Sequence, residues 1–145
     1  MFKDKTLSFI RSGIMAEAII RGLLSEEIVE PDRIVAAGPR PERGKSLEER
    51  HQIRVTTDNT YAAEEGQIVV LSVKPQVLPE VMPEIRGHLR RQDLVISVIA
   101  GMPIEKIANG LAHAAVARAM PNTPAQIGQG ITVWTVTPEV DDTQR

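Results

Sequence analysis

Short apolar runs recur along the chain and alternate with stretches in which apolar residues follow helical spacing. Several of these runs are apolar without alternation, which is typical of strands that are covered on both faces. The runs predict six strands, at residues 7–10, 34–37, 68–73, 94–99, 114–119 and 131–136.

The stretches between the runs predict helices. Residues 15–24 place apolar side chains at i, i+3, i+4, i+7 and i+8, which is the spacing of an amphipathic helix. Asp58 is suited to cap a short helix over 59–65, and Pro79 and Pro83 are expected to break or bend a helix within 75–89. Two further helices are predicted at residues 43–50, after a proline, and at 103–111, with its proline in the first turn.

This alternation of strand and helix predicts an α/β fold of the Rossmann-like, doubly wound type, with a mostly parallel sheet in a single domain over residues 1–137. Near the end, Thr137 and Pro138 resemble a helix start, with a threonine cap followed by a proline. Residues 138–145 are therefore expected to be the start of a truncated helix or linker.

Composition and charge exclude several function classes. A net charge of −2 and only one Trp, one Tyr and two Phe argue against a nucleic-acid partner. No run approaches the ~18 apolar residues that a membrane span requires, and no signal peptide is visible, so a soluble cytoplasmic protein is expected. The absence of cysteine excludes thiolate catalysis, and the three histidines lack ligand spacing, so no metal site is predicted and all three are interpreted as non-functional.

A glycine-containing turn follows the first predicted strand. Aligned to the dinucleotide-binding pattern G-x-G-x-x-G/A, the segment 11–16 has Ala16 at the third position, Gly13 at the second and Arg11 at the first. Ala16 permits close packing of helix and strand, and Gly13 lets the backbone approach a phosphate. Taken alone, the segment fits an ordinary strand–turn–helix connection equally well.

Arg11 is the unusual residue of this turn. A positive φ at this position would cost a non-glycine residue roughly 1 kcal/mol, and the side chain would fill space that a pyrophosphate needs. Alternatively, the guanidinium could pair with phosphate oxygens in bidentate fashion. Our hypothesis is that the first effect dominates and weakens cofactor binding.

The second predicted strand indicates which dinucleotide is preferred. An NAD site usually has an acidic residue at the end of this strand, and none stands at positions 36–40. Arg40 and Arg43 instead stand where a 2′-phosphate would lie, which favours NADP and leaves NAD open. On spacing alone, two solvated loop arginines are an equal alternative.

Four stretches of the chain together are far more specific than any one of them. They are Phe9-Ile10-x-x-Gly13-x-Met15-Ala16-Glu17-Ala18-Ile19, Val73-Lys74-Pro75-Gln76, Val95-Ile96-Ser97 through Ala100-Gly101, and Met120-Pro121-Asn122-Thr123-Pro124-Ala125 with Gly128 and Gly130. Through them the chain resembles, from about residue 5 to its end, the N-terminal dinucleotide-binding domain of the pyrroline-5-carboxylate reductases.

The resemblance implies a function and a set of contacts. The function is the NAD(P)H-dependent reduction of 1-pyrroline-5-carboxylate to L-proline in proline biosynthesis, which requires little acid–base machinery, so no catalytic side chain is predicted. The implied cofactor contacts are Ile10, Arg11, Ser12, Gly13, Ile14 and Met15 at the pyrophosphate, Gly38 and Asn59 on the adenosine side, and Ser72, Val73, Lys74, Pro75, Val98, Ile99 and Ala100 toward the nicotinamide. Asn122 and Thr123 would border the substrate.

The chain also departs from the family. Ser8, Arg11 and Ile14 interrupt the family's Gly-Phe-Ile-Gly-x-Gly-Asn-Met pattern, and two of these changes replace glycines. The family's second, helical domain, which forms the dimer, is expected to be absent. An apolar surface around 131–136 with Trp134 would then be left uncovered, which predicts self-association into a homo-oligomer.

Three functional hypotheses follow from these observations. The chain is a reductase acting on a small-molecule substrate, or a truncated and inactive relative that binds nucleotide. An unrelated NADP-dependent reductase fits the fold but not the segment 120–125.

Overall fold

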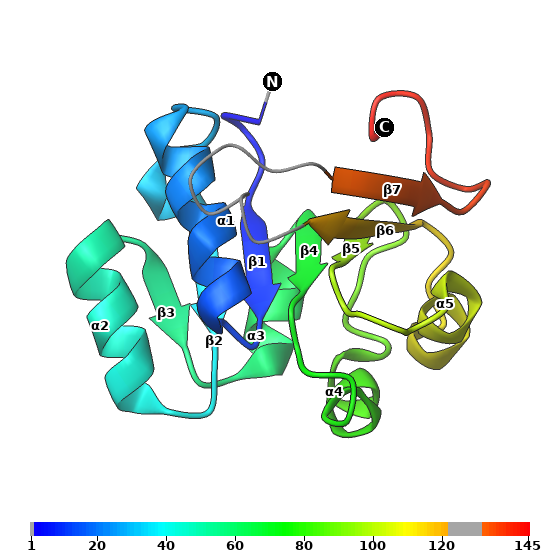
Figure 1. Ribbon diagram of the computed structural model, residues 1–145, viewed down its shortest axis with the longest axis horizontal. Helices are drawn as coiled ribbons and strands as arrows, with labels where there is room; N and C mark the ends of the chain where they lie inside the picture. The colour runs from blue at the N-terminus through cyan, green and yellow to red at the C-terminus, as the bar shows by residue number, and fades with distance from the viewer. Residues whose placement is uncertain (1, 122–131) are drawn as a thin grey trace.

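One sheet organises the chain in the computed structural model, which describes residues 2–121 and 132–145. Its strand order is β3-β2-β1-β4-β5-β6-β7. Strands β1 to β6 run parallel to their neighbours, and β7 pairs antiparallel with β6 (Figure 1). The strands are β1 (Leu7–Ile10), β2 (Ile34–Ala37), β3 (Arg54–Thr56), β4 (Ile68–Leu71), β5 (Leu94–Ser97), β6 (Val116–Pro121) and β7 (Thr132–Val136).

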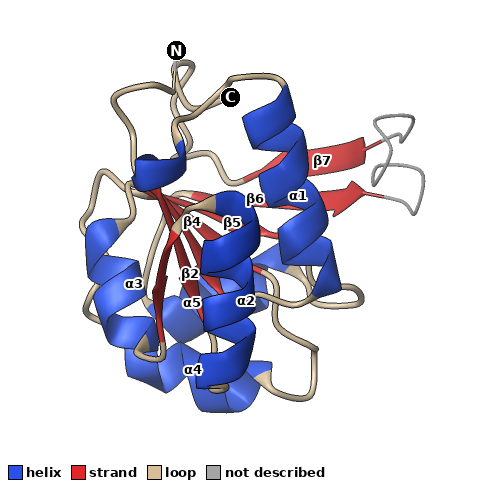
Figure 2. Cartoon of the chain, turned by 90° about the vertical axis from the view of Figure 1, so that its left-hand side faces the viewer, coloured by secondary structure: helices blue, strands red, loops and turns tan. Residues whose placement is uncertain are grey.

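Helices cover both faces of this sheet (Figure 2). They are α1 (Ile14–Ser25), α2 (Pro41–His51), α3 (Asn59–Glu65), α4 (Leu78–Ile85) and α5 (Ile104–Leu111), with a short 3₁₀ turn, η1 (Pro31–Arg33). One apolar cluster joins the sheet to α1 and α2, and a second joins it to α3, α4 and α5. The mostly parallel, doubly wound fold predicted from the sequence is confirmed.

Strand β1 lies at the centre of both clusters. Consecutive residues of a strand point to opposite faces, so Phe9 packs toward α1 and α2 while Ile10 packs toward α3, α4 and α5. Both side chains are fully buried. This double burial explains why the adjacent residues Phe9 and Ile10 are both apolar. It also fixes the position from which the following segment begins.

Several predictions about single elements are wrong in detail. The apolar runs do not include β3, because Arg54–Thr56 is a short, half-buried strand at the edge of the sheet. The predicted break at Pro79 and Pro83 does not occur, since α4 accommodates Pro79 in its first turn and Pro83 within its length. A proline in the first turn lacks only an N–H that has no partner within the helix.

The chain end also differs from the prediction. No helix begins at Thr137, because its hydroxyl donates to the Ala114 carbonyl oxygen at 2.6 Å and accepts the Val116 N–H at 3.0 Å. The following residues form turns, and Val140 is buried beside Leu94 and Ala115. Within the parts of the chain that the structure describes, no helix has both the length and the apolar character needed to span a bilayer.

Candidate functional site

A cavity of about 290 Å³ lies at the edge of the sheet where β1, β2 and β4 end. The strands that follow β1 are added first on one side of it, as β2 and β3, and then on the other side, beginning with β4. This reversal makes the carboxyl ends of β1 and β4 the topological switch point of the sheet. Open α/β sheets bind ligands at such a crevice. The cavity is lined by three turns, which contribute Arg11, Ser12, Gly13, Gly38, Pro39, Arg40, Arg43, Ser72, Val73, Lys74 and Val77.

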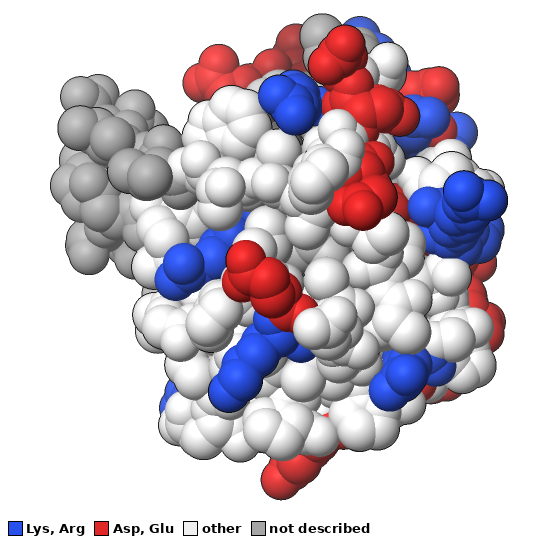
Figure 3. All heavy atoms as spheres, turned by 90° about the vertical axis from the view of Figure 1, so that its right-hand side faces the viewer, with Lys and Arg blue, Asp and Glu red and all other residues white. Residues whose placement is uncertain are grey.

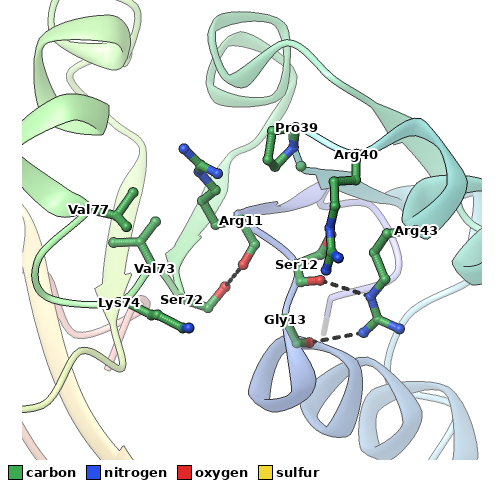
Figure 4. Close-up of a pocket in the computed structure, with 11 residues that line it drawn as sticks. Arg11, Ser12, Gly13, Pro39, Arg40, Arg43, Ser72, Val73, Lys74 and Val77 are labelled. Carbon is green, nitrogen blue, oxygen red and sulfur yellow. Dashed lines mark hydrogen bonds between the residues drawn. The ribbon is translucent and has the colours of Figure 1, made fainter.

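Hydrogen bonds fix the turn between β1 and α1 to both neighbouring strands. The buried hydroxyl of Ser12 donates to the Ala37 carbonyl oxygen at 3.1 Å, and the Ser12 N–H donates to the same oxygen at 2.9 Å. On the other side, the Ser72 hydroxyl donates to the carbonyl oxygen of Arg11 at 2.9 Å (Figure 4). The backbone that would face a pyrophosphate is therefore held from β2 and from the end of β4.

Arg11 adopts the backbone conformation that the sequence analysis considered costly. Its φ is +66°, in the left-handed region where glycine is favoured. Its side chain reaches into the cavity toward Pro39 and Val77 (Figure 4), and its Nε is buried without a hydrogen-bond partner among the described residues. The residue thus combines backbone strain with a buried polar atom that lacks a partner in the described structure.

Two other cations of the cavity are exposed. Arg40, at the cap position of α2, directs its guanidinium toward Ser12, and the ammonium group of Lys74 points into the space beside Gly13 (Figure 4). Neither side chain forms a hydrogen bond or ion pair with another residue in the described ranges. Together with Arg11 they make the cavity positively charged, as a binding site for a phosphate-bearing molecule requires.

Arg43 lines the same cavity, but its Nε and Nη2 are bonded to α1 and the turn before it. Its Nε donates to the Ser12 carbonyl oxygen at 3.3 Å, and its Nη2 donates to the Gly13 carbonyl oxygen at 3.4 Å (Figure 4). The same Nη2 forms a 2.9 Å ion pair with Glu17. Of the two arginines predicted for a 2′-phosphate, only Arg40 is unpaired within the described structure.

Glu17 connects α1 to α2. Its carboxylate accepts from Arg43 and also contacts Arg50 at 2.7 Å and His51 at 2.9 Å. Burial raises the pKa of Glu17. The hydrogen bonds from His51 and Arg43 and the charges of Arg43 and Arg50 together lower it by more, so the pKa lies below its ordinary value of 4.5. The carboxylate is therefore ionised at neutral pH.

The remaining predicted contacts lie around the cavity rather than on its wall. Ile10 and Ile99 are buried in the core, and Ile14 is 78% exposed at the start of α1. Asn59 donates to Glu84 of α4 at 2.9 Å. Met15, Pro75, Val98 and Ala100 do not line the cavity either. Asn122 and Thr123 lie outside the described residues.

Two lining residues were not predicted. Pro39 stands between the predicted Gly38 and Arg40, so sequence proximity was the available signal. Val77 precedes α4 and has no signal of its own, because an apolar residue before a helix is usually part of the core. The three histidines contact Glu17, Glu64 and the backbone of Asp93, all outside the cavity wall.

Comparisons with known proteins fit this geometry. The model of a family described as "NADP oxidoreductase coenzyme F420-dependent" matches residues 6–101, which contain every turn of the cavity. The chain therefore belongs to this family of dinucleotide-binding oxidoreductases.

Within this family the chain matches pyrroline-5-carboxylate reductases. It is 40% identical to the enzyme of that name from Synechocystis sp., over 87% of this chain and 47% of the relative. The solved structure of a pyrroline-5-carboxylate reductase from Coxiella burnetii has a TM-score of 0.91 and 32% identity, covering 97% of this chain and 52% of that one. The resemblance to the N-terminal dinucleotide-binding half of these reductases is confirmed.

A third relative shares the fold at lower identity. The Plasmodium falciparum pyrroline carboxylate reductase, crystallised with NADP bound, has a TM-score of 0.85 and 24% identity, covering 98% of this chain and 52% of that one. The chain spans about half the length of the curated relatives it matches.

Proposed function

We propose that this chain is the NADPH-binding part of a reductase that converts 1-pyrroline-5-carboxylate to L-proline in the cytoplasm. The observation that carries the proposal is the cationic cavity at the switch point, in a chain whose relatives are pyrroline-5-carboxylate reductases. Arg40 and Lys74 project into that cavity without partners among the described residues. A generic α/β domain would gain nothing from unpaired cations gathered at one strand edge.

The lining residues fit a dinucleotide. The pyrophosphate would lie beside Gly13 at the N-terminus of α1, where the N–H groups of Ile14 and Met15 have no partner within the helix. Arg40 would pair with the 2′-phosphate and so select NADP over NAD. Ser72, Val73 and Lys74 would continue toward the nicotinamide, with Asn122 and Thr123 bordering the substrate. When bound, the reduced nicotinamide supplies the hydride for the C=N carbon.

The chain's own contribution to the reaction is then binding and orientation. A protonated imine accepts hydride without a dedicated acid from the protein. This accounts for a cavity wall without histidine or carboxylate side chains in the described structure. We also propose that copies of the chain associate into a homo-oligomer.

A second candidate function is supported by Arg11. A nucleotide-binding relative without reductase activity would tolerate a strained φ of +66° and an arginine in the phosphate turn, both of which work against productive cofactor binding. In this case nucleotide binds, and the substrate is not reduced.

One pair of measurements separates these functions. The 145-residue chain is titrated with NADPH, and turnover of 1-pyrroline-5-carboxylate with NADPH is followed at steady state. Binding with turnover supports the reductase and overturns the second candidate. Binding without turnover is required by the second candidate and is also the result expected of a nucleotide-binding part tested alone. Absence of NADPH binding would overturn both.

A further inference from the structure

Arg43 and Arg40 stand three residues apart beside the same cavity, yet their side chains are used differently. All three contacts of Arg43 are to α1 and the turn before it, at Ser12, Gly13 and Glu17. Its side chain is about one-quarter exposed. Turning the Nε and Nη2 groups of Arg43 toward a phosphate on the cofactor would break an ion pair and two hydrogen bonds.

Glu17 keeps the Arg43 side chain in this orientation. One carboxylate oxygen pairs with Arg43, and the other contacts both Arg50 and His51. The Glu17 side chain is only 13% exposed. Glu17 comes from the first turn of α1 and its three partners all come from α2, so the cluster joins the two helices next to the cavity.

The contact at Gly13 has a consequence for phosphate binding. The Gly13 carbonyl oxygen accepts the Glu17 N–H at 3.1 Å, and Arg43 adds a second donor to it from outside the helix. A peptide unit is planar and trans, so a carbonyl held by both donors also fixes the direction of the Ile14 N–H. This N–H belongs to the first residue of α1, where helices bind anions, and Gly13 has no side chain with which to cap the helix. The Arg43 guanidinium therefore stabilises the turn by donating to the carbonyl oxygens of Ser12 and Gly13, on the side away from the N–H groups.

We propose that Arg43 and Glu17 are positioning residues: together they hold the backbone of residues 12–14 in the orientation that receives the cofactor's pyrophosphate, and Arg43 does not read the 2′-phosphate. The proposal rests on the proposed function for the identity of the ligand. The pyrophosphate is common to NADPH and NADH, whereas the 2′-phosphate is present only in NADPH. Loss of Arg43 should accordingly weaken both nucleotides by the same factor.

The test compares Arg43→Gln with Arg40→Gln in the full chain, using NADPH and NADH titrations. Arg43→Gln should raise both dissociation constants about tenfold, as expected for loss of a charge-assisted contact, and leave their ratio unchanged. Arg40→Gln should raise the value for NADPH alone. A selective loss of NADPH binding in Arg43→Gln would overturn the inference.

Glu17→Gln provides the second arm. It should reproduce the common loss, and the double variant with Arg43→Gln should bind no more weakly than either single variant, because the two residues act through one contact. Arg43→Lys, which keeps the charge but loses the planar fork, covers the case in which the glutamine variant does not fold. Additive losses would show that the residues act independently and would overturn the proposal.

A readout without nucleotide separates this inference from the proposed function. Amide hydrogen exchange at residues 13–17 should be roughly tenfold faster in Arg43→Gln than in the native chain, and unchanged in Arg40→Gln. Faster exchange in a chain that binds no nucleotide supports the positioning role and counts against the proposed function. Unchanged exchange in Arg43→Gln would overturn the positioning role, whatever the native chain binds.

Discussion

Polar groups are used in opposite ways at the two ends of the parallel strands, which we call the amino edge and the carboxyl edge of the sheet. At the amino edge, the Asp93 carboxylate is buried and accepts from the backbone N–H of Arg90 at 2.9 Å and from its Nε at 3.1 Å, while His113 contacts the Asp93 carbonyl oxygen at 2.7 Å. At the carboxyl edge, Arg11 is strained and Arg40 has no partner in the described structure. One edge uses polar groups for stability, and the other keeps them available to a ligand.

The largest effect on stability is expected at Asp93, whose buried carboxylate is hydrogen-bonded to Arg90. Asp93→Ala should lower the free energy of unfolding by about 1–3 kcal/mol, because it removes the buried carboxylate that accepts from the backbone N–H and the Nε of Arg90. Urea unfolding measures this loss, and Asp142→Ala, at an exposed carboxylate, should change stability by less than about 0.5 kcal/mol. NADPH affinity should be unaffected in both variants. Equal stability of the two variants would remove the distinction between the edges.

A smaller effect of opposite sign is expected at the carboxyl edge. Arg11→Gly should raise the free energy of unfolding by about 1 kcal/mol, because glycine adopts a φ of +66° without the Cβ penalty. It should also tighten NADPH binding, since the cavity gains space. Calorimetry and a nucleotide titration measure the two effects.

Arg11→Ala serves as the matched control for this change. It removes the side chain but keeps a Cβ at positive φ, so it should tighten binding without raising stability. Weaker NADPH binding by Arg11→Gly than by the native chain would show instead that the guanidinium pairs with phosphate.

The ion cluster of Glu17 predicts a modest loss of stability in acid. A carboxylate with a lowered pKa stabilises the fold fully above the ordinary value of 4.5, and this contribution is lost as the pH falls through the lower value of the folded state. The carboxylate faces Arg43, Arg50 and His51.

Urea unfolding from about pH 6 to about pH 3 should therefore show a stability advantage of the native chain over Glu17→Gln that shrinks only toward the acid end. Lys45→Gln, at a half-exposed position of α2 without an ion pair in the described structure, is the control for a surface charge change. A constant advantage at every pH would contradict the assignment.

The fold was predictable because its signals are local and redundant. Uninterrupted apolar runs mark buried parallel strands such as β2 and β4, and their alternation with helices defines the order in which the sheet is built. The cavity was predictable as far as motif positions follow strand ends, as at Gly13, Gly38 and Lys74. The ion pair between Arg43 and Glu17 was not predictable, because the two residues are 26 positions apart in sequence and meet only when α1 and α2 lie side by side.

The smallest effect on stability is expected at β7, which has a neighbour on one side only among the strands that the structure describes. Trp134 is 58% exposed there, and the face on the side of β7 and α5 is largely uncharged (Figure 3). An edge strand with an exposed indole favours pairing with a second copy of the chain. Sedimentation at rising concentration should show self-association, and Trp134→Lys should reduce it while changing the free energy of unfolding by less than about 0.5 kcal/mol.

Tyr61→Lys is the matched control for this substitution. Tyr61 is 43% exposed, but it lies on α3, where every backbone N–H of the helix interior is already bonded, so no strand edge accompanies the aromatic ring. If exposed aromatic area alone drove association, both lysine variants would reduce it. If the unpaired side of β7 is required, only Trp134→Lys will reduce self-association. A strictly monomeric native chain would show that β7 does not pair with a second copy of the chain.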